Sequence, residues 1–181
     1  MRRIEDDNLP TRRARRGFRK DSSGATAVEF ALIALPFIAM MGAIIETGIL
    51  YFADSALDNA TSEASRLIRT GQAQQSGFDA AAFRQKVCDG VTPLFTCSGI
   101  KVDVRTTTDF SSADVGTPVK ADGSFDDSKF KYDAGHGTDI VVVRVYYEWP
   151  AMLNLLAKDS SLNGNHLLAA VTAFRNEPFS W

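Results

Sequence analysis

The feature that most constrains this chain is an uncharged stretch of sixteen residues, Phe30–Ile45. Counted from Ala25 the stretch is 21 residues long, with Glu29 as its only charged member. A helix needs about 20 apolar residues to cross the hydrocarbon core of a bilayer. The stretch therefore predicts a transmembrane helix over residues 25–46. Two alternatives stay open: a helix buried in a soluble core, and the apolar region of a cleavable secretory signal, which is normally shorter and would be cut near Ala53–Ala56.

Charge is divided unevenly along the chain. Residues 1–24 hold eight Lys or Arg and four acidic residues, whereas the rest holds 12 basic and 18 acidic residues. Basic residues beside an apolar run keep that end in the cytoplasm, so residues 1–24 are predicted to be a cytoplasmic leader. The basic segment has one aromatic residue, Phe18, and no nucleic-acid-binding motif follows it. Nucleic acid is therefore not an expected partner.

Glu29 is the most informative single residue. A carboxylate at the centre of a membrane helix costs roughly 2.5–3.5 kcal/mol on insertion scales, and less near the edge. An acid in such a position usually has a partner. The plain alternative is that Glu29 sits at headgroup depth and faces water.

The sequence around Glu29 carries a motif. Residues 24–36 read Gly-Ala-Thr-Ala-Val-Glu-Phe-Ala-Leu-Ile-Ala-Leu-Pro. A basic leader, a Gly and an apolar helix with Glu as its fifth residue resemble the signal of type IV prepilins, and the Glu29–Phe30 pair resembles the variant found in tight-adherence (Tad) pili. Together with Glu46, Gly48 and the ending Ala173–Pro178, the chain is similar to the TadE-like pseudopilin family. Thr47 departs from the pattern, since an aromatic or apolar residue is more usual there.

The resemblance implies a processing site and an assembly site. Prepilin peptidase would cut after Gly24, where the missing side chain leaves the backbone adaptable, and Ala25 would be the mature N-terminus. The new amine would pair with the Glu29 carboxylate of a neighbouring subunit, which offsets the desolvation of both charges. Phe30 belongs to the same assembly motif. Glu29 would set the register of assembly and would not be catalytic.

The resemblance also implies the function, location and partners. The protein would be a minor pilin or pseudopilin of the Tad pilus, acting in assembly and so in adhesion and biofilm formation. It would be a single-pass protein of the bacterial inner membrane, with a cytoplasmic N-terminus and a periplasmic C-terminal domain that reaches the cell surface in a pilus. Its partners would be prepilin peptidase, other Tad pilins or pseudopilins and the assembly platform in the inner membrane.

Beyond the membrane the helix is predicted to continue over residues 47–70 as a periplasmic extension, with Gly71 as its stop. Apolar residues recur there at spacings of three and four, which predicts a stripe that packs on a sheet. These residues are Ile49, Leu50, Ala53, Leu57, Ala60, Ala64, Leu67 and Ile68. From Ala25 the helix would be about 69 Å long. Pro36 is predicted to kink it.

Residues 71–181 are predicted to form a periplasmic α+β domain, so the whole chain is α+β: a long helix on a small antiparallel sheet, as in pilins. The elements expected are a helix over 79–87, strands over 100–105, 139–149 and 167–175, and a short helix over 151–157; helix stays open for the last strand. An even number of cysteines in an exported domain favours a Cys88–Cys97 disulfide over free thiols or metal ligands.

The polar stretch between Thr106 and Gly137 is predicted to be a solvated loop, with a hairpin turn at Asp122-Gly123. It is rich in Asp, and a calcium site in it stays open although the residue order of a calcium loop is missing. No catalytic motif is present, and neither His136 nor His166 has ligand-like spacing or an acid, Ser or Cys arranged beside it. We therefore expect no enzyme activity, no cofactor and no metal site.

Two alternative functions remain. An uncleaved single-pass membrane protein would carry a periplasmic binding or scaffolding domain and keep its original N-terminus. A secreted binding protein would begin near Asp54–Leu57. The pilin hypothesis predicts Ala25 instead.

Overall fold

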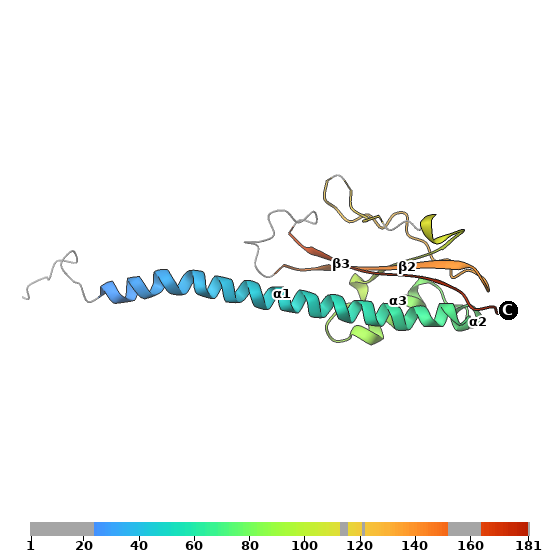
Figure 1. The fold of residues 1–181 in the computed structure, drawn as a ribbon, viewed down its shortest axis with the longest axis horizontal. Coiled ribbons are helices and arrows are strands. Elements are labelled where there is room, and N and C mark those ends of the chain that lie inside the picture. Colours follow the sequence, from blue (N-terminus) through green and yellow to red (C-terminus); the bar gives the residue numbers. More distant parts are fainter. Residues whose placement is uncertain (1–23, 113–115, 121, 152–163, 181) are drawn as a thin grey trace, which may run out of the picture. The chain divides into compact units, whose positions relative to one another are not determined.

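The computed structural model describes residues 24–112, 116–120, 122–151 and 164–180. Its elements follow in the order α1, α2, α3, a 3-10 turn, β1, a second 3-10 turn, β2 and β3 (Figure 1). The chain divides into two units, residues 1–41 and 42–181, and the buried core lies in the second. The predicted α+β class is confirmed: a long N-terminal helix packs on a small antiparallel sheet.

Helix α1 runs without a break from Ala25 to Arg69. It ends because Gly71 adopts a φ of 79°, a left-handed conformation that glycine tolerates and that is common after the last helical turn. The amide of Gly71 donates to the carbonyl of Ile68 at 3.0 Å. The predicted helix, with Gly71 as its stop, is thus confirmed. Pro36 lies inside α1, and the predicted kink there stays a prediction.

Within the second unit, α1 buries one stripe of its surface. Ala53, Leu57, Ala60, Ala64 and Ile68 are each at most 8% exposed. Their spacing of three or four residues places them on one side of the helix. The other predicted members, Ile49, Leu50 and Leu67, are partly buried against the same core. The predicted apolar stripe is therefore the surface by which α1 packs on the domain.

The sheet has three antiparallel strands in the order β1 (Lys101–Thr107), β2 (Ile140–Trp149) and β3 (His166–Arg175). All three were predicted to within two residues at each end, and the last, for which helix was open, is a strand. Val143 of β2 pairs with Val104 of β1 and with Thr172 of β3. Because β2 is the central strand, both of its faces are covered, as its nearly continuous apolar sequence predicts.

The two faces of the sheet have different covers (Figure 1). On one face the side chains of Val141, Val143 and Val145 join the core that contains the α1 stripe. The opposite face is covered by the connection between β1 and β2, in which the rings of Phe125 and Phe130 lie 5.8 and 5.7 Å from the ring of Tyr146. The stretch predicted to be a solvated loop therefore also packs on the sheet through its few aromatic residues.

Two shorter helices follow α1: α2 (Gln72–Gln75) and α3 (Ala80–Val91). The carboxylate of Asp79 caps α3 by accepting from the amide of Ala82 at 2.7 Å. The sequence predicted this helix over 79–87, and it is four residues longer at its end.

The extra turn of α3 is held by packing. Val87 and Val91 are both buried. Gly90 lies so close to α1 that a Cβ there would be 2.9 Å from the Cβ of Ala60. Packing against α1 therefore overrides the low helix propensity of Gly90.

Candidate processing and assembly site

The predicted processing site lies where α1 begins. Ala25 is the first residue of α1, Gly24 directly precedes it, and both are exposed. Apart from its chain neighbours, no atom of the described residues lies within 4 Å of the position that a Cβ on Gly24 would take. The fold itself therefore does not require glycine at position 24. The other leader residues, 1–23, lie outside the described part of the chain.

Glu29 and Phe30 lie in the second turn of α1. Phe30 is 73% exposed, and Glu29 is also exposed. Glu29 is one helical turn from Ala25, so the two residues share a side of the helix. Within the residues that the structure describes, the Glu29 carboxylate makes no hydrogen bond and no ion pair. It is available to a charge supplied from outside the chain.

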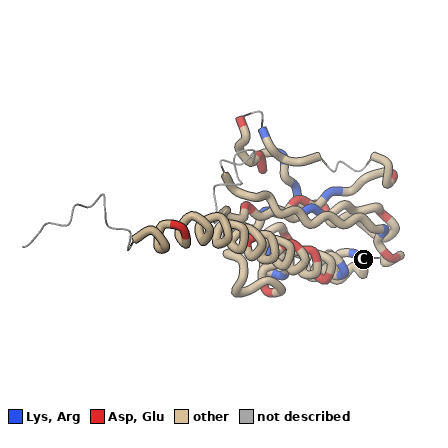
Figure 2. The backbone as a smooth tube through the Cα atoms, turned by 60° about the vertical axis from the view of Figure 1, so that its left-hand side comes forward, with Lys and Arg blue, Asp and Glu red and all other residues tan. Residues whose placement is uncertain are grey.

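The rest of the first half of α1 is apolar on all sides. Large apolar side chains between 46% and 73% exposed occur at every orientation around the helix. They are Val28, Phe30, Leu32, Ile33, Leu35, Phe37, Ile38, Met40, Met41, Ile44 and Ile45. Figure 2 shows these early turns almost free of charged residues. A helix that is apolar all round belongs in a protein core or a membrane. Helix α1 is long and apolar enough to cross a membrane, and no part of its most apolar stretch is buried.

Glu46 and Gly48 follow the apolar run. Glu46 is 8% exposed, whereas its neighbours Ile44 and Ile45 are 65% and 57% exposed. Gly48 is exposed, and apart from its own helix no atom of the described residues lies within 4 Å of a Cβ placed on it. The acid therefore faces the folded domain, and the glycine faces away from it.

The family model described as TadE-like protein matches residues 24–66. Residues 24–66 are TadE-like. The match begins at Gly24, covers most of α1 and contains all four predicted processing and assembly residues: Gly24, Ala25, Glu29 and Phe30. The resemblance is thereby confirmed for this segment and indicates a protein related to the Tad pilus. No curated protein sequence and no solved structure matches the chain.

The ending that resembles the family lies outside the TadE-like segment and has a structural role. Asn176 is 2% exposed, and its side-chain amide donates to the carbonyls of Ala134 at 3.0 Å and His136 at 2.9 Å. The amide of Glu177 donates to the carbonyl of Arg69, the last residue of α1, at 2.8 Å. This tail therefore joins the end of α1 to the loop before β2.

The predicted disulfide is present between Cys88 in α3 and Cys97, with the two Cα atoms 5.4 Å apart. The bond ties α3 to the turn that leads into β1, and Cys88 is fully buried. These cysteines belong to the core of the second unit and are not part of the processing and assembly site.

The acidic residues of the long connection are used in local turns. Asp109, Asp122 and Asp126 each accept hydrogen bonds from a nearby serine. The serine hydroxyls are the main reason why the pKa of each of these carboxyls is below its usual value. Gly123, with φ of 80°, completes the predicted turn, which is closed by the antiparallel bridge between Val119 and Phe125.

No group of three or more His, Cys, Asp or Glu side chains among the described residues is arranged to hold a metal ion. The calcium hypothesis therefore has no candidate site among these residues. Asp114, another acidic residue of the stretch between Thr106 and Gly137, lies outside them. The His136 side chain is 91% exposed, and its Nδ1 lies 3.7 Å from a carboxylate oxygen of Asp139. From the sequence, no acid was expected beside this histidine. His166 begins β3.

The sequence did not reveal the most buried charges among the described residues. Asp103 is fully buried and accepts from Nε of Arg144 at 2.9 Å, from Nε of Arg105 at 2.9 Å and from the amide of Lys131 at 2.8 Å. Arg144 is 4% exposed. The available signal was an opposite charge on each of two predicted strands, but the strand register that pairs residues 103 and 144 was unknown.

Proposed function

We propose that the protein is a minor pilin or pseudopilin of the Tad pilus, cut after Gly24 by prepilin peptidase and held in the inner membrane by the first half of α1. The observation that carries this proposal is the TadE-like match, which begins at Gly24 and contains Glu29. The role is structural: the subunit takes part in pilus assembly and, through the pilus, in adhesion and biofilm formation.

Processing would hydrolyse one peptide bond. Water adds across the bond between Gly24 and Ala25, which leaves a carboxylate on Gly24 and a protonated amine on Ala25. The open surroundings of Gly24 support this step, because the bond is not covered by other parts of the described chain. Since the fold does not require glycine there, the requirement would come from the peptidase.

Assembly would use the charge that processing creates. The carboxylate of Glu29 has no partner in the described chain, and in a membrane an unpaired charge is costly. A neighbouring subunit's Ala25 amine would neutralise it and fix the axial register between the two helices. The exposed ring of Phe30 would pack beside this pair.

The orientation has two supports. The basic leader favours a cytoplasmic N-terminus. The Cys88–Cys97 disulfide favours an oxidising compartment for the domain, which in a bacterium is the periplasm.

The structure disfavours one of the two alternative functions and is compatible with the other. A secreted protein cut near residues 54–57 is disfavoured, because Ala53 and Leu57 are fully buried inside an unbroken helix and a cut between them would divide its packed stripe. An uncleaved membrane anchor uses the same span and the same domain. It differs from the proposal only at the N-terminus.

The mature N-terminus therefore tests the proposal. It would be determined by mass spectrometry on protein from the native host's membranes and from surface material removed by shearing. Ala25 is expected in the membranes, and its presence in the sheared fraction would place the protein in the fibre. An intact N-terminus would support the uncleaved anchor, and one near residue 55 would support secretion.

Two variants separate processing from assembly. Gly24→Val should block cleavage, whereas Glu29→Gln should leave cleavage and membrane insertion intact but impair incorporation into pili. Glu148→Gln is the matched control, since Glu148 is an exposed glutamate on β2. Normal piliation by the Glu29→Gln strain would contradict the pairing of amine and carboxylate.

A further inference from the structure

The exposed side of α1 changes character abruptly within the second unit. Up to Phe52 its largest exposed side chains are apolar, and they include Tyr51 at 72% and Phe52 at 68% exposure. From Ser55 onward the exposed side chains are polar or charged. They are Ser55, Asp58, Asn59, Ser62, Glu63, Arg66 and Arg69.

The change occurs on one and the same side of the helix. Successive residues are turned by about 100° around an α-helix, so Ile44, Ile45, Tyr51 and Phe52 lie within an arc of about 120°. Ser55, Asn59 and Ser62 fall in that arc one to three turns later. The opposite side, at Glu46 and Ala53, is buried throughout. The packing of α1 on the domain is therefore continuous, while the medium on its exposed side changes.

The position of the change fits the thickness of a bilayer. From Ala25 to Phe52 the helix rises 27 residues, or about 40 Å. A bilayer with its headgroup regions is about 40–45 Å thick. The predicted span 25–46 covers the hydrocarbon core and ends before the aromatic pair.

Two polar residues between the run and the aromatic pair are compatible with lipid contact. Glu46 is 8% exposed and faces the domain. The hydroxyl of Thr47 donates to the carbonyl of Ala43 at 2.8 Å, so it needs no water. Neither residue brings an unsatisfied charge to the exposed side.

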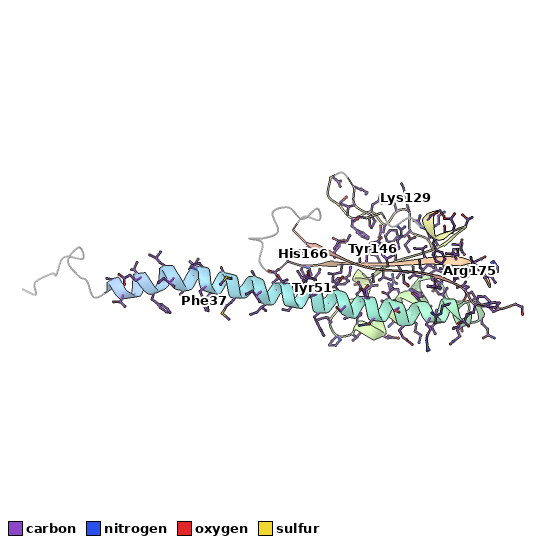
Figure 3. The ribbon with its side chains drawn as sticks, viewed as in Figure 1. Phe37, Tyr51, Lys129, Tyr146, His166 and Arg175 are labelled. Atoms are coloured by element: carbon purple, nitrogen blue, oxygen red, sulfur yellow. A yellow bond between two sulfur atoms is a disulfide. The ribbon has the colours of Figure 1, made fainter. Side chains whose placement is uncertain are left out.

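The first residues of β3 lie beside the turn of α1 that contains Tyr51. His166, Leu167 and Leu168 line one groove together with Thr47, Leu50, Tyr51 and Asp54 of α1. Figure 3 shows His166 and Tyr51 close together at one end of the sheet, with Arg175 at the other end. This end of the domain is the end nearest the aromatic pair.

We propose that Tyr51 and Phe52 lie in the lipid headgroup region on the domain side of the membrane, so that the membrane-contacting part of α1 extends to Phe52 and the end of the domain at His166–Leu168 rests on the bilayer surface. The inference rests on the membrane anchoring in the proposed function. Aromatic residues with an apolar body favour this region, and tyrosine adds a hydroxyl for its polar side. A protein partner is disfavoured, because it would not require the change to coincide with the thickness of a bilayer.

Depth-dependent fluorescence quenching tests the inference. The full chain, with Trp149→Phe and Trp181→Phe, receives one tryptophan by Phe37→Trp, Phe52→Trp or Asn59→Trp. Each variant is reconstituted in vesicles of phosphatidylethanolamine and phosphatidylglycerol that carry bromine either near the headgroup or near the end of the acyl chain. Acrylamide in the buffer reports exposure to water. If the background chain does not fold, the same substitutions are made in the native chain and its own quenching is subtracted; Trp149 is only 8% exposed.

The inference predicts a depth order along the helix. Phe52→Trp should be quenched about twofold more by shallow than by deep bromine, as expected for a residue of the interfacial aromatic belt. Phe37→Trp should show the reverse, and Asn59→Trp should respond only to acrylamide. If Phe37→Trp behaves as expected but Phe52→Trp responds to neither bromine position, residue 52 is in water or under a protein partner, and the inference fails while the anchor stands. If Phe37→Trp is unquenched, the anchor fails as well.

Discussion

The buried ion pair of Asp103 and Arg144 connects β1 to β2 on the face of the sheet that lies away from α1. Removing one partner of such a pair costs about 3–5 kcal/mol, because the other charge stays buried. Asp103→Ala should therefore lower the free energy of unfolding by about 3 kcal/mol or more in urea titrations. Asp127→Ala is the control: its 2.8 Å ion pair with Lys101 is about half exposed and should contribute less than about 1 kcal/mol.

A double variant shows whether charge or packing is responsible. Replacing both partners by apolar residues, as in Asp103→Val with Arg144→Leu, should be less destabilising than Asp103→Ala alone. Equal losses in the single and double variants would mean that the pair acts through shape and not through charge.

Tyr132 gives a prediction about alkaline pH. Its hydroxyl is buried without a hydrogen-bond partner among the described residues, and burial, helped by the charge of Asp79, raises its pKa from 10.0 to about 12. The folded state therefore holds this proton more tightly than the unfolded state. This stabilisation is complete below pH 10 and is lost as the pH rises from 10 to 12. Because Tyr132 is only partly buried and solvent screens its surroundings, the loss stays below the roughly 2–3 kcal/mol that the full shift would give.

Tyr132→Phe should remove this alkaline loss and should be neutral or slightly stabilising at pH 7. The measurement is the free energy of unfolding of both chains at pH 8 and above pH 11. An unchanged difference between Tyr132→Phe and the native chain across this range would contradict the prediction.

At the scale of elements, the tail after β3 holds the end of α1. Asn176→Ala would remove the donors at 3.0 and 2.9 Å from the carbonyls of Ala134 and His136. The Ala134 carbonyl keeps a second donor, Nε2 of Gln74 at 2.8 Å, whereas no other donor to the His136 carbonyl is present among the described side chains. We expect a loss of about 2 kcal/mol in unfolding free energy, together with faster hydrogen exchange in the last turn of α1. Glu177→Ala is the neighbouring control, since its carboxylate lies 4.0 Å from Arg69 at an exposed site. A similar loss in both variants would show that the Asn176 side chain has no special role.

The elements that sequence predicted well are those whose signal is local. The apolar run and the stripe of spacing three and four were enough for α1. Alternation of apolar and charged residues was enough for β1, and a nearly continuous apolar run was enough for β2. The end of α3 was missed because Gly90 has a low helix propensity, and the packing against Ala60 that overrides it could not be predicted from the sequence. The Asp103–Arg144 pair was missed because it depends on a register between strands that more than thirty residues separate.

At the scale of the whole molecule, every buried apolar residue in the described part of the chain lies at or beyond Ala53, whereas the large apolar residues described before it are exposed or only partly buried. The same helix therefore supplies one surface to the core of the second unit, and its first half presents apolar surface that is long enough to cross a membrane. The TadE-like match, over residues 24–66, covers both parts of the helix.

This division predicts how truncated chains behave. A chain of residues 53–181, made under oxidising conditions, should fold as a monomer, about 1–3 kcal/mol less stable than the domain in the full chain because it lacks the partly buried Ile49 and Leu50. A chain of residues 42–181 should be as stable as the domain in the full chain. It should associate with other copies, however, because it exposes an apolar surface formed by Ile44, Ile45, Tyr51 and Phe52. Circular dichroism with urea and light scattering after gel filtration measure the two properties. If residues 53–181 fail to fold, the turns before Ala53 are part of the core; if residues 42–181 stay monomeric without detergent, the aromatic pair does not need lipid.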